Sequence, residues 1–393
     1  RPPDTDSSEG RVLILYGRHS IDDDDIAAVI DVLRSDWLTT GPAVAGFEKA
    51  VADYLGVPHA VAVNTGTAAL HTAMAVLGVG PGDEVIVPCL TFVATANAAV
   101  FQGARPVFAD VDPATLLIDP ADVERRITPR TKAIVGVDYA GQPCDWQALR
   151  AIAAPRGIAL VADGCHALGA RRDGVAVGRL ADLTALSFHP VKHVTTAEGG
   201  MLIALDPTHD RKARAFRSHG IDTDWRERAE KGTFSYAMTS LGWNYRLPDV
   251  NCALGISQMK KLDRWLVRRR EIAAIYDRAF AGNNAFTPLA TERGVEHAYH
   301  LYVIRLDASY GAVGRADLHA RLRARGIGAN VHYPVVHLHP FYRERFATAP
   351  GLCPAGEQAA DLILTLPLHQ GMTDAEVTRV IDAVLAETRA RAA

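Results

Sequence analysis

The sequence has no long apolar run, no excess of positive charge and no closely paired cysteines, and each absence excludes a class of protein. No apolar stretch approaches the roughly 18 residues of a membrane-spanning helix, and the polar opening RPPDTDSSEG is unlike a signal peptide. Lysine and arginine total 42 against 45 acidic residues, so we expect neither nucleic acid nor a membrane as a partner. The five cysteines form no C-x-x-C pair in a chain of 393 residues, which indicates free thiols and a cytoplasmic location.

Short apolar strands alternate with helical segments through the first half of the chain. Helices are predicted over 20–34, with Ser20 as the N-cap, and over 43–54, because apolar residues recur there at helical spacing. Further helices are predicted over 67–77, 92–102, 120–126 and 145–154. Nearly continuous apolar strands between helices predict a mostly parallel sheet with both faces covered. The predicted strands are His59–Val63, Glu84–Val87, Pro106–Ala109, Ala133–Val137, Ile158–Ala162 and Thr184–Phe188.

The second half of the chain departs from this alternation. An extended stretch at Met201–Ala204 precedes a polar segment, 206–247, which is predicted to be loop with short helices. One long helix is predicted from about Asp249 to about Phe280, with the arginines 268–270 on a solvated face or at a dimer contact. Strands near 299–305 and 361–366 and helices near 315–325 and 373–390 predict a smaller α+β domain. We therefore expect an N-terminal segment and large domain over 1–255, and a linking helix and small domain over 256–393.

Three polar features follow strand ends, which is where ligands bind in an open α/β sheet. Gly66 and Thr67 begin a helix whose free N–H groups suit a phosphate, although ordinary helix capping is the plainer explanation. Asp163 ends an apolar strand, where it either meets a cation or caps a helix. Lys192 is one of only 7 lysines and the only formal cation over 183–197. A lysine in such an apolar segment has two explanations. Either its side chain extends to the surface, or its amine is buried and is neutral or covalently bound.

The combination of these features is more specific than any one of them. A phosphate cup at a helix end, an acid at a strand end and a buried lysine about 30 residues further on is the arrangement that holds pyridoxal 5′-phosphate (PLP). The helix takes the phosphate, the acid keeps the ring nitrogen protonated, and the lysine forms a Schiff base with the aldehyde. PLP is therefore the predicted cofactor.

Six stretches of the sequence resemble those of one enzyme family. They are WLTTGP (37–42), NTGTAALH (64–71), TFVATANA (91–98), ADGCHALGA (162–170), SFHPVKHVTTAEGG (187–200) and GWNYRLPDVNCALG (242–255). In this order they resemble the DegT/DnrJ/StrS-type sugar aminotransferases, which implies an α/β protein of PLP fold type I, like aspartate aminotransferase. The opening GRHSIDDDDIAAVIDVLRSDWLTTGP, DYAGQPCD (138–145) and VHYPVVHLHPFY (331–342) are most similar to the pseudaminic-acid branch.

The resemblance implies a role for each residue of the cofactor site. Lys192 would be the Schiff-base lysine, Asp163 would pair with the pyridinium nitrogen, and His166 would lie near the phenolic oxygen. The related sugar dehydratases carry His in place of this lysine, so its presence favours transamination. The other implied cofactor contacts are the phosphate ligands Gly66, Thr67 and Ser187, the stacking residue Phe92, and Asn244 from the second subunit of a dimer.

Cations for a sugar diphosphate are harder to assign. Arg18, Arg217 and Arg246 are candidates, and Arg246 is favoured because it shares the stretch GWNYR with Asn244. A structural salt bridge would explain Arg246 equally well.

The histidines of VHYPVVHLHP raise the question of a metal site. Their spacing fits no standard zinc pattern and no cysteine lies nearby in the sequence, so no metal is predicted. His332 and Tyr333 are instead predicted to contact the substrate, and His337 and His339 to be ordinary loop residues.

The predicted function is the PLP-dependent transamination of a nucleotide-linked ketosugar. The resemblance implies UDP-4-keto-6-deoxy-N-acetylhexosamine as the type of substrate, L-glutamate as the donor, and a homodimer with active sites at its interface. Half-reactions with donor and acceptor alternate, which gives ping-pong kinetics. One alternative is the same chemistry on a ketocyclitol or another natural-product ketosugar. Another is a catalytically silent PLP-binding regulator, although no DNA-binding domain is recognisable.

Overall fold

A seven-stranded sheet is the main feature of the computed structural model, which describes residues 13–221, 223, 228, 230 and 232–389. The strand order is β2-β10-β9-β6-β5-β3-β4, and β10 runs antiparallel to the others. The mostly parallel sheet predicted from the sequence is confirmed. Its strands are β2 (His59–Val63), β3 (Glu84–Pro88), β4 (Arg105–Ala109), β5 (Thr131–Val137), β6 (Ala159–Asp163), β9 (Leu183–Ser187) and β10 (Gly200–Ala204).

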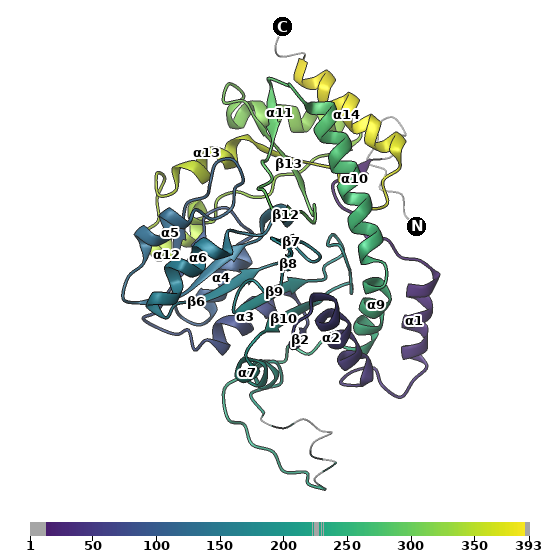
Figure 1. The fold of residues 1–393 in the computed structure, drawn as a ribbon, viewed down its shortest axis with the longest axis vertical. Helices are drawn as coiled ribbons and strands as arrows, with labels where there is room; N and C mark the ends of the chain where they lie inside the picture. Colours follow the sequence, from purple (N-terminus) through teal and green to yellow (C-terminus); the bar gives the residue numbers. More distant parts are fainter. Residues whose placement is uncertain (1–12, 222, 224–227, 229, 231, 390–393) are drawn as a thin grey trace.

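Helices cover both faces of this sheet (Figure 1). Successive residues of a strand point to opposite faces, and β2 shows the consequence. Val61 and Val63 belong to the apolar cluster that contains residues of α3 and α4, whereas Ala60 and Ala62 belong to the cluster that contains residues of α2. Apart from the first, which is described below, the helices predicted in this half occur with ends shifted by no more than one residue. They are α2 (Pro42–Leu55), α3 (Gly66–Val76), α4 (Val93–Phe101), α5 (Pro120–Arg126) and α6 (Trp146–Ala153), and α7 (Pro207–Arg217) follows β10.

The first helix, α1 (Asp23–Leu33), begins later than predicted. Its N-cap is Asp22 and not Ser20, because Asp22 and Asp25 form a reciprocal capping box. The Asp22 carboxylate accepts the N–H of Asp25 at 3.3 Å, and the Asp25 carboxylate accepts the N–H of Asp22 at 3.1 Å. Asp25 is fully buried and pairs with Lys261 at 2.9 Å, which fixes α1 against the later helices.

The long helix predicted from Asp249 to Phe280 is two helices, α9 (Asp249–Met259) and α10 (Leu262–Phe280). The backbone between them, at Lys260 and Lys261, keeps nearly helical dihedral angles. The apolar spacing therefore continues across the interruption, and this is why the sequence pattern did not reveal it.

The smaller C-terminal part is built on an antiparallel sheet of β11 (Phe286–Pro288), β13 (Tyr302–Leu306) and β15 (Ile363–Leu366). It shares one apolar cluster with α10, α11 (Gly311–Ala324) and α14 (Asp374–Arg389), as expected for an α+β unit. The predicted boundary between 255 and 256 falls inside α9 and stays a prediction. Shorter elements are β1 (Ile14–Leu15), paired with β14 (Ile327–Gly328), β7 (Arg171–Arg172), β8 (Val175–Ala176), β12 (Val295–Glu296), α12 (Pro340–Phe346), α13 (Pro354–Leu362), and the 3-10 turns η1 (Tyr139–Gly141), η2 (Ala154–Arg156) and η3 (Val336–Leu338).

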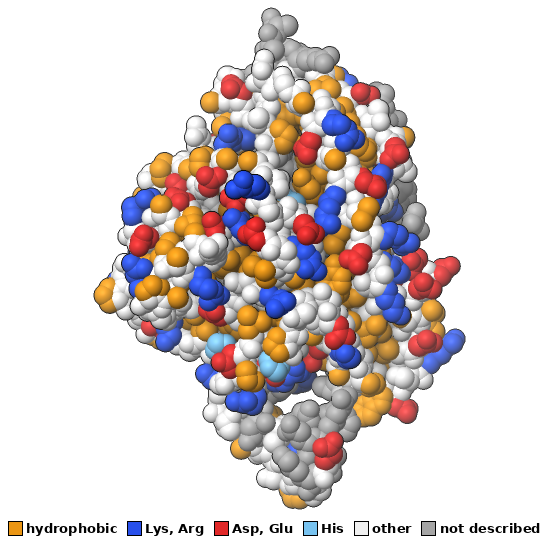
Figure 2. All heavy atoms as spheres, in the orientation of Figure 1, with side chains coloured by type: hydrophobic (Ala, Val, Ile, Leu, Met, Phe, Trp, Pro, Cys, Tyr) orange, Lys and Arg blue, Asp and Glu red, His pale blue; other side chains and the backbone are white. Residues whose placement is uncertain are grey.

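The surface carries charges of both signs. Figure 2 shows acidic and basic side chains interspersed over the face in view. Of the helices that the structure describes, none combines the length and apolar character needed to cross a membrane.

Arg269 contradicts the prediction that the arginines 268–270 lie on a solvated face. Its guanidinium is fully buried and donates to the carbonyls of Tyr299 and Leu368, each at 3.1 Å, and to the Gln370 side chain at 2.8 Å. These hydrogen bonds offset part of the cost of burying the cation, while its Nε atom has no partner among the described residues. Arg269 thereby links α10 to two loops of the smaller part.

Removing the Arg269 guanidinium should lower the free energy of unfolding. Arg269→Ala leaves a cavity and removes the donor from three acceptors, of which the Leu368 carbonyl is buried, so we expect about 3 kcal/mol of destabilisation. The measurement is the midpoint of chemical unfolding, with Arg264→Ala on the exposed side of the same helix as the control, which should change stability by less than about 0.5 kcal/mol. Equal midpoints for the two variants would contradict a structural role for Arg269.

Candidate active site

A cavity of about 430 Å³ lies where β2, β6 and β9 end. Ligands bind at this edge in open α/β sheets, and the cavity gathers residues from segments that are far apart in the sequence. Nine of the residues singled out from the sequence line it: Gly66, Thr67, Phe92, Asp163, His166, Ser187, Lys192, His332 and Tyr333.

The N-terminus of α3 forms one wall of this cavity. Thr65 is the N-cap, and its hydroxyl accepts the N–H of Ala68 at 2.9 Å. A Cβ atom on Gly66 would lie 2.9 Å from the Cβ atom of Ser187 and 3.2 Å from the sulfur of Cys165, so only glycine lets the helix approach this closely. The unpaired N–H groups of the first turn, the helix dipole and the Ser187 hydroxyl then face one small volume, which suits a phosphate.

Asp163 is held rigidly at the end of β6. One carboxylate oxygen accepts the hydroxyl hydrogen of Thr95 at 2.7 Å, and the other accepts the N–H of Cys165 at 3.3 Å. Thr95 also contacts the hydroxyl of Thr91 at 2.8 Å. Asp163 is 6% exposed, and the limited solvent strengthens its interaction with a cationic group in the cavity. These contacts fix the Asp163 carboxylate in a position that suits pairing with a protonated ring nitrogen.

Lys192 lies in the segment after β9 and also lines the cavity. Burial lowers the pKa of its amine, while the neighbouring Cys165 and Asp163 act in the opposite direction. A lowered pKa increases the fraction of neutral amine, which is the form that condenses with an aldehyde. Burial also raises the pKa of the Cys165 thiol well above its ordinary value, so that thiol is a poor nucleophile.

His166 presents an unused polar atom inside the cavity wall. Its Nε2 atom lies 3.1 Å from the hydroxyl of Tyr333, but its buried Nδ1 atom has no hydrogen-bond partner within the described ranges. Its ring also packs against His300, with 4.4 Å between ring centroids. Burial keeps the pKa of His166 well below its ordinary value, so the ring is neutral and free to share a hydrogen bond with a bound group.

Phe92 lies at the mouth of the cavity. It precedes α4, is 55% exposed, and its ring centroid is 5.8 Å from that of Tyr333. An exposed aromatic ring over a polar site suits the stacking of a flat heterocycle. With a phosphate cup, a fixed carboxylate and a lysine in the same cavity, the residues fit PLP.

Two predicted residues lie outside this cavity. Asn244 is exposed and its backbone pairs with Ser218, while the neighbouring Tyr245 carbonyl accepts the N–H of Asn64 at 2.9 Å. Arg246 is half-buried, and its side chain has no salt bridge within the residues that the structure describes. In one chain, therefore, neither residue completes the cofactor cavity.

Arg217, Arg18 and His332 were also candidates for contacts with the substrate, and the structure places them differently. Arg217 binds Glu48 at 2.5 Å and the Ala62 carbonyl at 2.7 Å, so it is a structural residue and not a substrate contact. Arg18 is exposed, two residues after Tyr16, which lines the cavity. His332 lines the cavity and its Nδ1 atom contacts Thr365 at 2.9 Å.

Sequence reasoning missed Thr95, which donates to Asp163, and two residues that line the cavity, Tyr16 and His300. Thr95 lies in the quoted stretch TFVATANA, and a hydroxyl one helical turn after Thr91 was its only signal. Tyr16 and His300 come from opposite ends of the chain. No local pattern marks them, because only the fold brings them to the sheet edge.

Most of the chain is similar to known proteins. The sequence profile of the DegT/DnrJ/EryC1/StrS aminotransferase family matches residues 19–385. Spore coat polysaccharide biosynthesis protein SpsC of Bacillus subtilis (strain 168) is 40% identical over 372 residues, or 94% of this chain and 95% of SpsC.

Two solved structures also superpose on this chain over nearly its whole length. Spr1654 of Streptococcus pneumoniae, described as a sugar aminotransferase and solved in its PMP form, gives a TM-score of 0.91 at 32% identity and covers 96% of this chain and 99% of its own. Helicobacter pylori PseC, an aminotransferase of pseudoaminic acid biosynthesis, gives 0.90 at 33% identity and covers 96% of this chain and all of its own (100%).

These matches confirm the family, the fold type and the aminotransferase class that the sequence predicted. They agree with a cavity whose residues fit PLP, and a neighbour solved in its PMP form agrees with that cofactor. This chain belongs to the DegT/DnrJ/EryC1/StrS aminotransferase family.

Proposed function

We propose that this PLP-dependent aminotransferase converts a nucleotide-linked ketosugar to the aminosugar, with L-glutamate as the donor and a substrate of the UDP-4-keto-6-deoxy-N-acetylhexosamine type. The observation that carries the proposal is the meeting of Lys192, Asp163 and the α3 N-terminus in one cavity. PLP bound there would serve as an electron sink for a carbanion next to the amino nitrogen.

The chain's own residues have distinct tasks in this chemistry. The Nζ atom of Lys192, whose pKa burial lowers, would hold the cofactor and would move a proton to and from the substrate carbon. Asp163, fixed by Thr95, would pair with the ring nitrogen of the bound cofactor and favour its protonated form. The first turn of α3 and Ser187 hold the phosphate and so fix the ring beside Lys192.

Two observations support the proposed substrate class. One is the set of residues at the mouth of the cavity, and the other is the similarity to known relatives. Phe92, Tyr333 and His332 offer an aromatic and polar lining, which is typical of a carbohydrate site in that it combines a flat apolar surface with hydrogen-bonding groups. PseC belongs to pseudoaminic acid biosynthesis and SpsC to spore coat polysaccharide biosynthesis. Both relatives favour a sugar over a free ketocyclitol.

A homodimer with shared active sites is part of this proposal. The described residues between α7 and α9 extend away from the sheet (Figure 1) and expose several large apolar side chains. Exposed apolar surface of this kind marks a protein interface. A second subunit placed there would bring Asn244 and Arg246 to the neighbouring cavity. The exposed residues are Phe234, Tyr236, Met238, Leu241 and Trp243.

The alternative of a silent PLP-binding regulator predicts bound cofactor without turnover. Lys192, Asp163 and His166 are all present in the cavity, so the chain retains the groups that transamination needs. A stable yellow colour after the addition of L-glutamate, and again after a keto acid, would favour the regulator.

The role of Lys192 is tested by locating the cofactor. After borohydride reduction, peptide mass spectrometry should find the reduced cofactor on the peptide that contains Lys192. Lys192→Ala should carry no covalent cofactor and should lose at least about 100-fold in turnover. Lys49→Ala, which changes an exposed lysine paired with Asp53, should behave like the wild type. Covalent cofactor on another lysine would refute the site assignment.

The substrate is tested with a panel of ketones. With L-glutamate as donor, formation of 2-oxoglutarate should be fastest with the UDP-linked 4-keto sugar, by at least about tenfold in kcat/KM over a dTDP-linked ketosugar or a free ketocyclitol, a difference of about 1.4 kcal/mol. Turnover of free cyclitol ketones alone would remove the nucleotide-sugar assignment and leave the aminotransferase class intact.

The shared site is tested by mixing inactive subunits. In a mixed dimer of Lys192→Ala and Asn244→Ala chains, one of the two sites carries neither lesion, so random mixing should restore about a quarter of wild-type activity. Lys192→Ala mixed with Asp163→Ala is the control, because every site then carries a lesion. Equal activity of the two mixtures would argue against a contribution of Asn244 in trans.

A further inference from the structure

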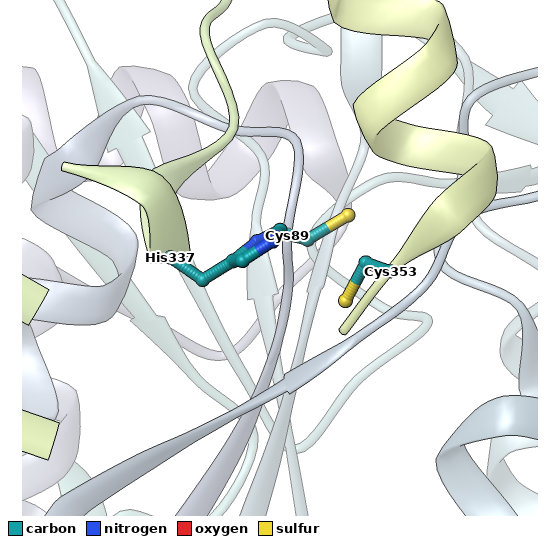
Figure 3. Close-up of side chains that lie close together, drawn as sticks. All are labelled: Cys89, His337 and Cys353. Atoms are coloured by element: carbon teal, nitrogen blue, oxygen red, sulfur yellow. The ribbon is translucent and has the colours of Figure 1, made fainter. Parts of the chain in front are cut away.

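A second group of reactive side chains lies outside the cofactor cavity. Cys89 follows β3, His337 lies on η3, and Cys353 immediately precedes α13, and Figure 3 shows the three side chains converging from separate segments. All three residues are fully buried. The sulfur and nitrogen atoms that they offer as ligands lie within 4.8 Å of one another.

His337 has one ring nitrogen engaged and one unused. Its Nε2 atom lies 2.9 Å from the Oε1 atom of Glu357, while its buried Nδ1 atom has no hydrogen-bond partner in the described part of the chain. Glu357 is itself fixed, because it accepts the N–H groups of Gly351 at 2.8 Å and Cys353 at 3.1 Å. A histidine that binds a metal generally donates its other N–H to a carboxylate in this way. Glu357 therefore selects the tautomer that leaves a lone pair on Nδ1.

The two cysteines are free thiols and do not form a disulfide. The Cys353 sulfur lies 3.8 Å from the carbonyl oxygen of Phe108, and the Cys89 sulfur lies 3.8 Å from the Oδ1 atom of Asp110. These are weak contacts for a thiol, and the Cys89 thiol also interacts with that of Cys353, so the sulfurs have no strong partner outside the cluster. Asp110 accepts three backbone N–H groups, from Val111, Ala355 and Gly356, and so its carboxylate is held in place beside Cys89.

We propose that Cys89, His337 and Cys353 bind one Zn²⁺ ion, with the Asp110 carboxylate as the oxygen donor nearest to a fourth position. Two thiolates, an imidazole and an oxygen donor form a ligand set typical of zinc. The carboxylate favours Zn²⁺ over Cu⁺, which prefers soft ligands alone. On binding, both thiols release their protons to solvent and His337 stays neutral.

This site was not expected from the sequence, which predicted no metal. Only His332, His337 and His339 were close enough in the sequence to be considered together, and the fold separates them. His332 lines the cofactor cavity, whereas His337 joins Cys353, from the start of the next long helix, and Cys89, from a distant segment. The inference does not depend on the proposed function, because it concerns residues on the other side of the cavity wall.

The expected consequence is structural. The Val336 N–H donates to the Cys89 carbonyl at 2.8 Å, and Leu90 pairs with Val335. These segments continue directly into the cavity wall, where Phe92 and Tyr333 lie. A zinc ion at this point would tie both segments to α13 and hold the wall in place.

The first test is the zinc content and coordination of the reduced holoenzyme. After equilibration with Zn²⁺ and removal of excess ion, we expect one zinc per chain, and X-ray absorption at the zinc edge should show sulfur neighbours at about 2.3 Å and nitrogen or oxygen neighbours at about 2.0–2.1 Å. This measurement needs no variant, so it decides the question even if variants fold poorly. Coordination by nitrogen and oxygen alone, or a content far below one, would overturn the proposal.

The second test uses variants. Cys353→Ala and His337→Phe should each weaken Zn²⁺ binding by at least about 100-fold, and a chelator should lower the unfolding midpoint of the wild type but not of these variants. Cys252→Ala removes a buried cysteine of α9 and is the matched control, which should keep one zinc per chain. Retention of zinc by Cys353→Ala, preference for Cu⁺ over Zn²⁺, or isolation of a Cys89–Cys353 disulfide from the freshly purified protein would each contradict the proposal.

Discussion

The close approach of α3 to the ends of β9 and β10 is the constraint on which the rest of the cofactor site depends. Two glycines permit it. A Cβ atom on Gly66 would lie 2.9 Å from the Cβ atom of Ser187, and one on Gly200 would overlap the carbonyl of Thr65. A side chain at either position would push the positive end of the helix away from the sheet edge. The phosphate cup would then lose its place relative to Asp163 and Lys192, which come from the neighbouring strands.

Several neutral histidine rings lie around Lys192, which faces the N-terminus of α3 across the cavity. Burial lowers the pKa of His166, His193 and His300 well below the ordinary value, and that of His332 to about 4. His193 is held by the Ala298 carbonyl at 2.9 Å and His332 by Thr365 at 2.9 Å. These rings supply hydrogen bonds and apolar surface without adding positive charge. The histidines therefore stay uncharged near neutral pH, whereas burial raises the pKa of Asp138, whose backbone N–H donates to the Asp163 carbonyl, to about 7.

The sequence predicted what depends on local spacing and missed what depends on topology. Strands and helices of the large sheet were recognisable because apolar periodicity is a local property. Asp163 and Lys192 were recognisable because one ends a strand and the other lies shortly after one. The contact between Thr95 and Asp163 joins residues far apart in the chain, and no spacing encodes it. The same holds for Arg269, whose acceptors lie in two later loops. The interruption between α9 and α10 escaped detection for the opposite reason, since the apolar pattern keeps its phase through Lys260 and Lys261.

The segment that carries Asn244 connects the cavity to the exposed apolar surface. Its backbone is fixed at one end, because the Tyr245 carbonyl accepts the N–H of Asn64 directly before the phosphate cup. Trp243 stacks on Tyr245 with 5.7 Å between ring centroids and still remains 49% exposed. Rings that are rigidly held and exposed on one side need no reordering to pack against a second surface, so their burial would cost little entropy. In the proposed dimer, the same segment would therefore contact the chain's own phosphate cup through its backbone and the partner's cavity through its side chains. A change in subunit packing would then be felt directly at the cofactor.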